Sequence, residues 1–286
     1  MIIKKFKIIL MLLILSIPIY AQEASRKGVV VDNVKTSTDS FKWRILRGNL
    51  PTEESLVFNV YWQFIKVGQG TLEIRGFENI NDRIAYHLYS QAKSSPFFDT
   101  FFEVRDINQS WLDVESLCSL RYSANISEGG WKKKEQVDFD HVNQKFILND
   151  NGSIKEGNTA LWVQDVISAL YFFRTLDLEV GKEYIFDAHS GDKFWALKTK
   201  VTGKETIETK AGTFNCLILE PVLRENAGIF QAKGRLQVWV TDDDKKIPVK
   251  MKTKIPVGSI IAELAEYQNK VPKENIKEDE NDNKTN

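Results

Sequence analysis

The sequence has few of the residues that build reactive or metal-binding sites. Only two of its 286 residues are cysteine and three are histidine, and their spacing does not form a zinc-binding pattern. It contains no glycine-rich phosphate loop and no Gly-x-Ser-x-Gly motif between a strand and a helix. The usual signatures of nucleotide-binding proteins and serine hydrolases are therefore excluded. We expect no catalytic residue, no metal site and no cofactor.

The histidines and the acidic runs are expected to be structural. His87 falls in a strand pattern, and His141 and His189 fall at expected hairpin tips. The run Asp242–Asp244 lacks the alternating ligands, the glycine and the distant glutamate of a calcium loop, so we interpret it as a hairpin turn. A pair of carboxylates suited to glycoside cleavage stays open as an alternative, because a sequence does not show how far apart its acids lie.

The first 21 residues have the order of a secretory signal peptide. Lys4, Lys5 and Lys7 precede an apolar run, Ile8–Ile19, and a small residue, Ala21, follows. The apolar run is too short to cross about 30 Å of hydrocarbon, which takes about 20 residues. We therefore expect cleavage after Ala21, no later membrane span, and a location in the periplasm or outside a Gram-negative cell. An uncleaved N-terminal anchor is the alternative.

Neither sign of charge is in large excess. The chain has 39 basic and 39 acidic side chains, and removing the three lysines of the signal leaves an excess of three acids. A nucleic-acid partner demands a basic face, so none is expected. Hydrophobic residues make up 42% of the chain, which suffices for a packed core.

Beyond the signal peptide the composition defines three regions. Residues 22–50 mix charged and small polar residues and form a lead-in segment, and residues 51–269 form a β-rich domain. Residues 270–286 contain nine charged residues and no aromatic residue, which predicts a disordered charged tail.

Period-two alternation predicts strands throughout the central domain. Leu56, Phe58, Val60, Trp62 and Phe64 share one face of a half-buried strand. Similar runs recur at short spacing between turn signals, which favours antiparallel hairpins. Further strands are predicted at 71–75, 84–91, 110–113, 117–126 and 132–139, and then at 184–188, 194–201, 206–210, 214–220, 235–240, 249–255 and 259–264.

One helix is predicted, at Ala160–Thr175, with Asn158 or Thr159 as its N-cap. Its apolar side chains cover about 220° of its circumference, whereas a surface helix needs an apolar stripe of little more than about 100°. The helix must therefore be covered on several sides, with Leu170 and Phe173 almost fully buried. The predicted fold is mostly β: a single antiparallel, strongly curved sheet or open barrel wrapped around this one buried helix.

The two cysteines, Cys118 and Cys216, both fall on predicted strands. In an oxidising compartment a disulfide between them would close a loop of nearly 100 residues and could stabilise the fold by up to about 4.7 kcal/mol. A buried free thiol, in contrast, packs as a small hydrophobic group. The pattern favours two buried thiols, and the disulfide stays an alternative.

Short segments in a fixed order carry a family resemblance. They are Tyr61–Gly68, Thr71–Ile74, Asp165–Arg174, Ala211–Phe214, Glu220–Pro221, Trp239–Asp243 with Pro248, and Gly258–Ser259. With these segments the chain resembles the exported bacterial proteins grouped as domain of unknown function 3108, over about residues 50–268. The resemblance implies export and a β-rich fold with an internal helix. It implies no activity and assigns no site residue.

The segment after Pro96 is rich in aromatic residues. Phe97, Phe98, Phe101 and Phe102 would share one side of a helical turn. One interpretation is a lid that contacts an apolar ligand, and the other, which the pattern favours, is a plug in the domain's own core.

The expected function is non-enzymatic. A curved sheet around a helix can leave a cavity, and an exported protein meets lipids, so we expect an apolar or amphipathic envelope molecule in the concavity. Tyr171, in the polar stripe of the helix, is a further candidate contact. The alternative is an envelope adaptor without a small-molecule ligand, which would have a filled core and an exposed patch.

Overall fold

The structure is a computed structural model, and it describes residues 29–30, 41–46, 48–221 and 236–269. The expected signal peptide, most of the lead-in segment and the charged tail lie outside the described residues.

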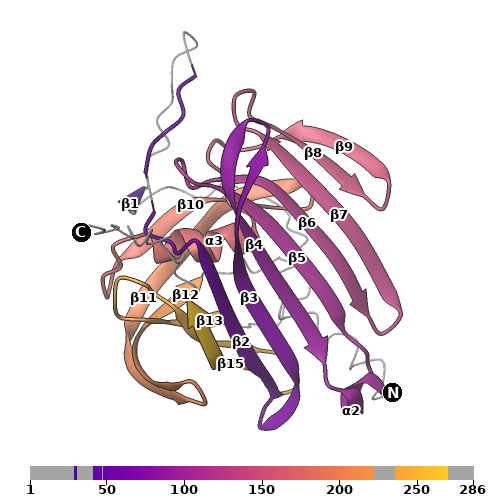
Figure 1. The fold of residues 1–286 in the computed structure, drawn as a ribbon, viewed down its shortest axis with the longest axis vertical. Coiled ribbons are helices and arrows are strands. Elements are labelled where there is room, and N and C mark those ends of the chain that lie inside the picture. The colour runs from indigo at the N-terminus through magenta and orange to yellow at the C-terminus, as the bar shows by residue number, and fades with distance from the viewer. Residues whose placement is uncertain (1–28, 31–40, 47, 222–235, 270–286) are drawn as a thin grey trace, which may run out of the picture.

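The described part of the chain forms one fifteen-stranded sheet and two helical segments (Figure 1). The strands are β1 (Val29–Val30), β2 (Glu53–Trp62), β3 (Ile65–Ile80), β4 (Arg83–Ser94), β5 (Arg105–Asp113), β6 (Ser119–Glu128), β7 (Trp131–Asp140), β8 (Lys145–Asp150), β9 (Ser153–Asn158), β10 (Glu183–Ser190), β11 (Lys193–Thr209), β12 (Gly212–Pro221), β13 (Leu236–Thr241), β14 (Pro248–Lys254) and β15 (Ser259–Asn269). The helical segments are α2 (Pro96–Asp99) and α3 (Val166–Arg174).

The strand order follows from two runs of neighbouring hairpins. It is β1-β10-β11-β12-β13-β14-β15-β2-β3-β4-β5-β6-β7-β8-β9, with β15 paired to β2 and β1 added parallel to β10. All other neighbours pair antiparallel. The order ends at β1 and β9, so the sheet stays open. The predicted single, open and curved antiparallel sheet is confirmed.

The first strand ends earlier than the sequence predicted. Leu56, Phe58 and Val60 are buried on the inner face as expected, but the chain turns after Trp62 and Gln63 adopts a φ of 55°. Phe64 therefore lies in the turn and is 83% exposed, so its predicted place on the buried face is wrong.

Two strands, β8 and β9, were not predicted from the sequence. In β8 only Phe146 and Leu148 are buried, and β9 is a mostly exposed edge strand. In β8 the exposed Ile147 stands between the two buried residues, so three consecutive apolar residues hide the alternation, and β9 has no buried side chain that would show one. Two other predicted strands, 194–201 and 206–210, are one strand, β11, interrupted by a β-bulge between Val201 and Gly203.

Helix α3 begins six residues later than predicted, and the predicted N-caps are wrong. Trp162 has a φ of 60°, and the backbone of Gln164 hydrogen-bonds to β10. Asp165 is the N-cap and forms a capping box with Ser168. The segment before Val166 therefore directs its backbone hydrogen bonds outside the helix.

The helix lies inside the curved sheet, as predicted. In Figure 1, α3 lies between strands β2–β9 and the strands that follow the helix. Seven of its nine residues are buried, and Tyr171, Phe172 and Phe173 pack in one core with inward side chains from both halves of the sheet. The wide apolar arc thus identified a helix that is covered on several sides.

Candidate functional site

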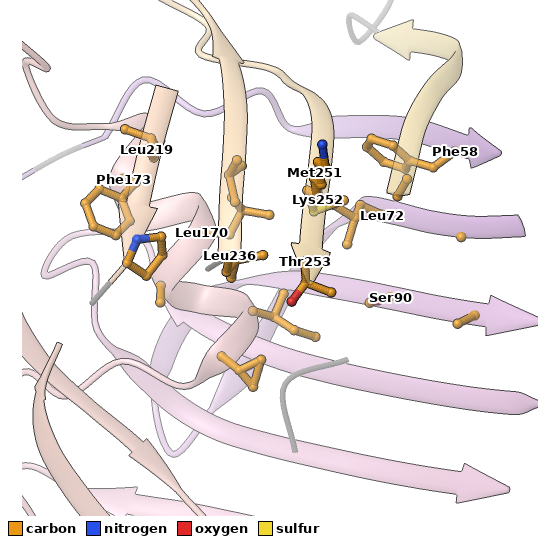
Figure 2. A pocket seen from close by; sticks show the side chains of 18 of the residues that line it. Phe58, Leu72, Ser90, Leu170, Phe173, Leu219, Leu236, Met251, Lys252 and Thr253 are labelled. Atoms are coloured by element: carbon orange, nitrogen blue, oxygen red, sulfur yellow. The ribbon is translucent and has the colours of Figure 1, made fainter. Parts of the chain in front are cut away.

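A cavity of about 160 Å³ lies between α3 and the inner face of the sheet (Figure 2). Its lining is dominated by apolar side chains, among them Leu170 and Phe173 of α3, Leu219 of β12, Leu236 of β13 and Met251 of β14. In volume it resembles the cavity of about 150 Å³ that binds benzene in another protein, and it is smaller than the pockets of about 300–1,000 Å³ that enclose whole drug-sized ligands.

Small residues leave this space open. Gly70 on β3, Ala92 on β4, Ala262 on β15 and Ala169 on α3 all line the cavity. A Cβ added at Gly70 would lie at least 3.8 Å from its nearest neighbouring atoms, so the backbone there leaves room for a side chain to begin. Small side chains on the facing strands and on the helix therefore leave a gap between the helix and the sheet.

The cavity explains a wrong prediction about the helix. Phe173 is buried, as expected, whereas Leu170 is only half-buried because it lines the cavity. The apolar arc places Leu170 on a covered side of the helix, and packing in three dimensions leaves space beside it.

Two buried hydroxyl groups without a hydrogen-bond partner among the described residues line the same cavity. Thr199 on β11 is fully buried and Thr253 on β14 is 5% exposed, and their Oγ1 atoms have no hydrogen-bond partner among the described residues. An unsatisfied buried hydroxyl costs about 1–3 kcal/mol, so such groups in a cavity wall favour a polar partner such as water or a ligand atom.

The register places these two threonines near one end of the sheet. Thr199 pairs with Pro221, Leu236 pairs with Thr253, and Thr253 pairs with Ile260. Ile260 in turn pairs with Trp62, the last residue of β2. The end of the cavity with the two unpaired hydroxyls therefore lies near the β2–β3 turn.

An ion pair, Arg174–Glu54, fixes the helix that forms one wall of the cavity. The Arg174 guanidinium donates two hydrogen bonds to the carboxylate of Glu54 on β2, at 2.5 and 2.8 Å, and a third to the Lys245 carbonyl at 3.1 Å. Both side chains are 1% exposed. This pair was not predicted from the sequence, although an arginine in a mostly apolar helix is a signal that an acid lies opposite it.

The start of α3 is fixed by a second buried acid. Asp165 accepts hydrogen bonds from the Ile167 and Ser168 amides at 2.8 and 2.9 Å, and from the Ser110 and Ser119 hydroxyls at 2.5 Å each. Burial raises the pKa of this carboxyl above its ordinary value, and the hydrogen bonds oppose that shift. The Asp165 cap and the Arg174–Glu54 ion pair together hold the two ends of the helix against the sheet.

The predicted contacts Phe97, Phe98, Phe101 and Phe102 do not line the cavity. Phe102 is buried and Phe98 is half-buried against a core cluster that includes Phe58, whereas Phe97 and Phe101 are 68% and 65% exposed. Two rings thus pack inward and two face solvent, and contact of this segment with an apolar ligand stays a prediction.

Tyr171 is also absent from the cavity wall. It is fully buried in the core, with the Arg174 guanidinium 5.1 Å from its ring. Burial raises the pKa of its hydroxyl, which has no hydrogen-bond partner among the described residues.

Two carboxyl groups meet on the inner face of β5 and β6. Asp106 and Glu128 are 2% and 5% exposed and hydrogen-bond to each other, and the Ser127 amide donates to Asp106 at 2.9 Å. Burial raises the pKa of Asp106 to about 6 and that of Glu128, which also feels the neighbouring acid, to about 8. Glycosidase carboxylates stand about 5–9.5 Å apart around a substrate, so a directly hydrogen-bonded pair does not have that geometry.

Two of the three histidines, His141 and His189, pack in the interior. His141 is buried and its Nε2 lies 2.8 Å from the Ser119 carbonyl, and His189 lies between the rings of Phe139 and Phe146. Burial lowers the pKa of both imidazoles to about 4. Both therefore stay neutral at ordinary pH.

A second depression, of about 450 Å³, lies beside β7 and β8 and is less suited to an apolar ligand. Its wall contains Arg83, Asp138, Asp140, Lys145 and Glu156. Arg83 and Asp138 already form ion pairs with Asp113 and Arg121. We therefore place the candidate site in the smaller, apolar cavity.

The cysteines are free thiols in separate core clusters. Burial raises the pKa of Cys118 to about 12 and that of Cys216 to about 11, so neither is a reactive thiolate at neutral pH. Of the two alternatives, the structure has the pair of buried thiols.

The described ranges contain no cluster of three or more histidine, cysteine, aspartate or glutamate side chains arranged to hold a metal ion. They also contain no helix with the length and apolar character that a membrane crossing requires.

Comparison with solved structures supports the fold alone. The crystal structure of a β-barrel-like protein of domain of unknown function 1849 from Brucella abortus matches with a TM-score of 0.53 and 8% identity, covering 78% of this chain and all of that one. A second match is the crystal structure of an exported-protein candidate with a YmcC-like fold from Bacteroides fragilis. It is 8% identical, covers 79% of this chain and 99% of that one, and has a TM-score of only 0.30.

Comparison with sequences identifies the family. No curated protein sequence matches the chain. The family model described as a protein of unknown function, DUF3108, matches residues 57–265, which include β3–β14, α2, α3 and the whole cavity wall. The chain therefore belongs to the DUF3108 family.

Proposed function

We propose that the protein is a non-enzymatic binding protein that holds an alkyl chain of an amphipathic envelope molecule in the cavity beside α3. The apolar wall formed by α3 and the facing strands carries this proposal. The volume of about 160 Å³ suits one short stretch of chain, with the rest of the ligand outside.

The two threonines give the ligand an orientation. Thr199 and Thr253 offer unpaired hydroxyls in a wall that is mostly apolar. A few polar groups in an apolar pocket commonly fix the direction in which a ligand enters. The polar end of the ligand, or a water bound to it, would therefore lie beside this pair.

The expected signal peptide brings the protein to the place where such ligands occur. The basic, apolar and small-residue order of residues 1–21 favours export, so the proposed location is the periplasm or the outside of a Gram-negative cell.

Filling the cavity tests the proposal. We would titrate the mature protein with dodecanoic acid by isothermal calorimetry and compare Leu170→Trp, Gly70→Leu and the matched control Ile154→Trp, whose site on β9 is exposed. We expect saturable binding to the wild type and the control, and at least about tenfold weaker binding to both filled variants. Equal binding to all four proteins would overturn the site. Gly70→Leu covers the case in which Leu170→Trp fails to fold.

A further inference from the structure

Six exposed apolar side chains gather at one end of the sheet, which we call the aromatic tip. They are Phe64 and Ile65 at the β2–β3 turn, Phe97 and Phe101 at α2, Trp131 at the start of β7, and Val257 between β14 and β15. In Figure 1, the β2–β3 turn and α2 both lie at the lower end of the molecule.

Backbone hydrogen bonds join these turns into one surface. The Ser95 amide donates to the Val67 carbonyl at 2.9 Å, which ties α2 to β3. The Gln63 amide donates to the Ser259 carbonyl at 2.8 Å, and the Gly129 amide donates to the Glu103 carbonyl at 2.8 Å. The β14–β15 turn and the β6–β7 turn are thereby attached to the same end.

Contacts on the inner side of the segment around α2 hold the rings of Phe97 and Phe101 outward. Phe98 and Phe102 pack inward, the Phe97 and Phe101 ring centroids lie 5.6 Å apart, and the Arg105 guanidinium donates to Asp99 at 2.6 Å. Exposed apolar patches on soluble proteins commonly mark interaction sites.

Basic side chains surround the aromatic tip. Lys66, Lys93, Lys132 and Lys254 are exposed, and none of the four forms an ion pair within the described ranges. Arg105 pairs with the nearby Asp99, and its guanidinium lies 3.4 Å from Glu103. The free charge at this end is therefore positive, although the chain as a whole has equal numbers of basic and acidic residues.

We propose that the aromatic tip docks on the surface of an anionic lipid bilayer. Aromatic rings favour the interface between water and hydrocarbon, and lysines with long apolar stems reach the lipid headgroups. Binding of this kind grows with the buried apolar area and with attraction to anionic lipids. The side chains protrude from four separate turns at the strand ends, which suits a deformable lipid surface better than a flat protein face.

The position of the cavity agrees with this docking. Ile260, which lines the cavity, pairs with Trp62, two residues before Phe64. A tip embedded in a bilayer would bring the threonine end of the cavity close to the lipids. The docking does not require that the cavity hold a lipid, so the two proposals can fail separately.

Vesicle flotation tests the docking with the mature full-length chain. We would compare vesicles of phosphatidylcholine alone with vesicles that also contain phosphatidylglycerol. The test variant is Phe64→Ser/Phe97→Ser/Phe101→Ser. The matched control is Ile45→Ser/Ile84→Ser/Val142→Ser, which removes three exposed apolar side chains near the β5–β6, β3–β4 and β7–β8 turns at the opposite end.

We expect the wild type and the control to bind the anionic vesicles, the triple phenylalanine variant to bind at least about tenfold more weakly, and binding to weaken in high salt. Binding that is absent in the wild type, unchanged in the phenylalanine variant or lost equally in the control would overturn the proposal. So would a purified protein partner that occupies the tip while vesicles do not. Leu170→Trp should keep vesicle binding, which separates a failure of the cavity from a failure of the tip.

Discussion

Removing either partner of the Arg174–Glu54 pair should destabilise the protein strongly. Each single change, Arg174→Met or Glu54→Leu, leaves one uncompensated charge in a site where both side chains are 1% exposed. Breaking a buried pair in this way costs about 3–5 kcal/mol. In the arginine variant the Lys245 carbonyl also loses its donor.

The double variant shows whether the two charges stabilise each other or whether the two side chains contribute only by packing. With both charges replaced by apolar side chains, no buried charge is left unpaired, so the double variant should be more stable than either single variant. Urea unfolding followed by tryptophan fluorescence measures the four proteins. At a slope of about 2 kcal/mol per M, a loss of about 4 kcal/mol lowers the midpoint by about 2 M. Two results would refute a stabilising ion pair: single variants that each lose less than about 1 kcal/mol of unfolding free energy, or a double variant whose loss equals the sum of the two single losses.

Three further predictions follow from other buried groups. Asp165→Ala should cost about 2–5 kcal/mol in urea unfolding, because it removes the N-cap and an acceptor shared by two buried serine hydroxyls, whereas Asp165→Asn, which keeps an acceptor oxygen, should cost less. Asp106 and Glu128 have pKa values raised in the folded state to about 6 and about 8, so their contribution to stability is present below about pH 4 and is lost as pH rises through about 6–8; Glu128→Gln should flatten this decline, and an unchanged pH profile would contradict it. Cys118 and Cys216 should react with a thiol reagent only after denaturation, and a non-reduced chain that lacks both thiols would show a disulfide instead.

The sequence predicted the overall architecture because the architecture rests on local patterns. Alternating strands such as β2 and short turns imply hairpins, and the apolar arc of α3 implies cover on several sides. The errors fall where non-local pairing decides. Trp162 and Gln164 leave the helix because β10 binds their segment, and the polar edge strand β9 has no buried face to reveal it.

The candidate site was much less predictable than the fold. A cavity forms where inward side chains from distant segments are together too small to fill the space between them. Neither Gly70 nor Ala262 predicts such a cavity when it is considered alone. The aromatic cluster near Pro96 was visible in the sequence, but the directions of its rings depend on the packing of α2 against β3. The sequence therefore indicated an unusual segment without showing that Phe97 and Phe101 face solvent.

Native mass spectrometry of the mature protein purified from its own cell envelope tests the central claim most directly. The cavity beside α3 predicts a fraction of wild-type protein that carries one additional molecule containing an alkyl chain, and that fraction should disappear in Leu170→Trp. A bare protein mass in the wild type that stays bare after incubation with excess dodecanoic acid, or an adduct that persists equally in the filled variant, would contradict it.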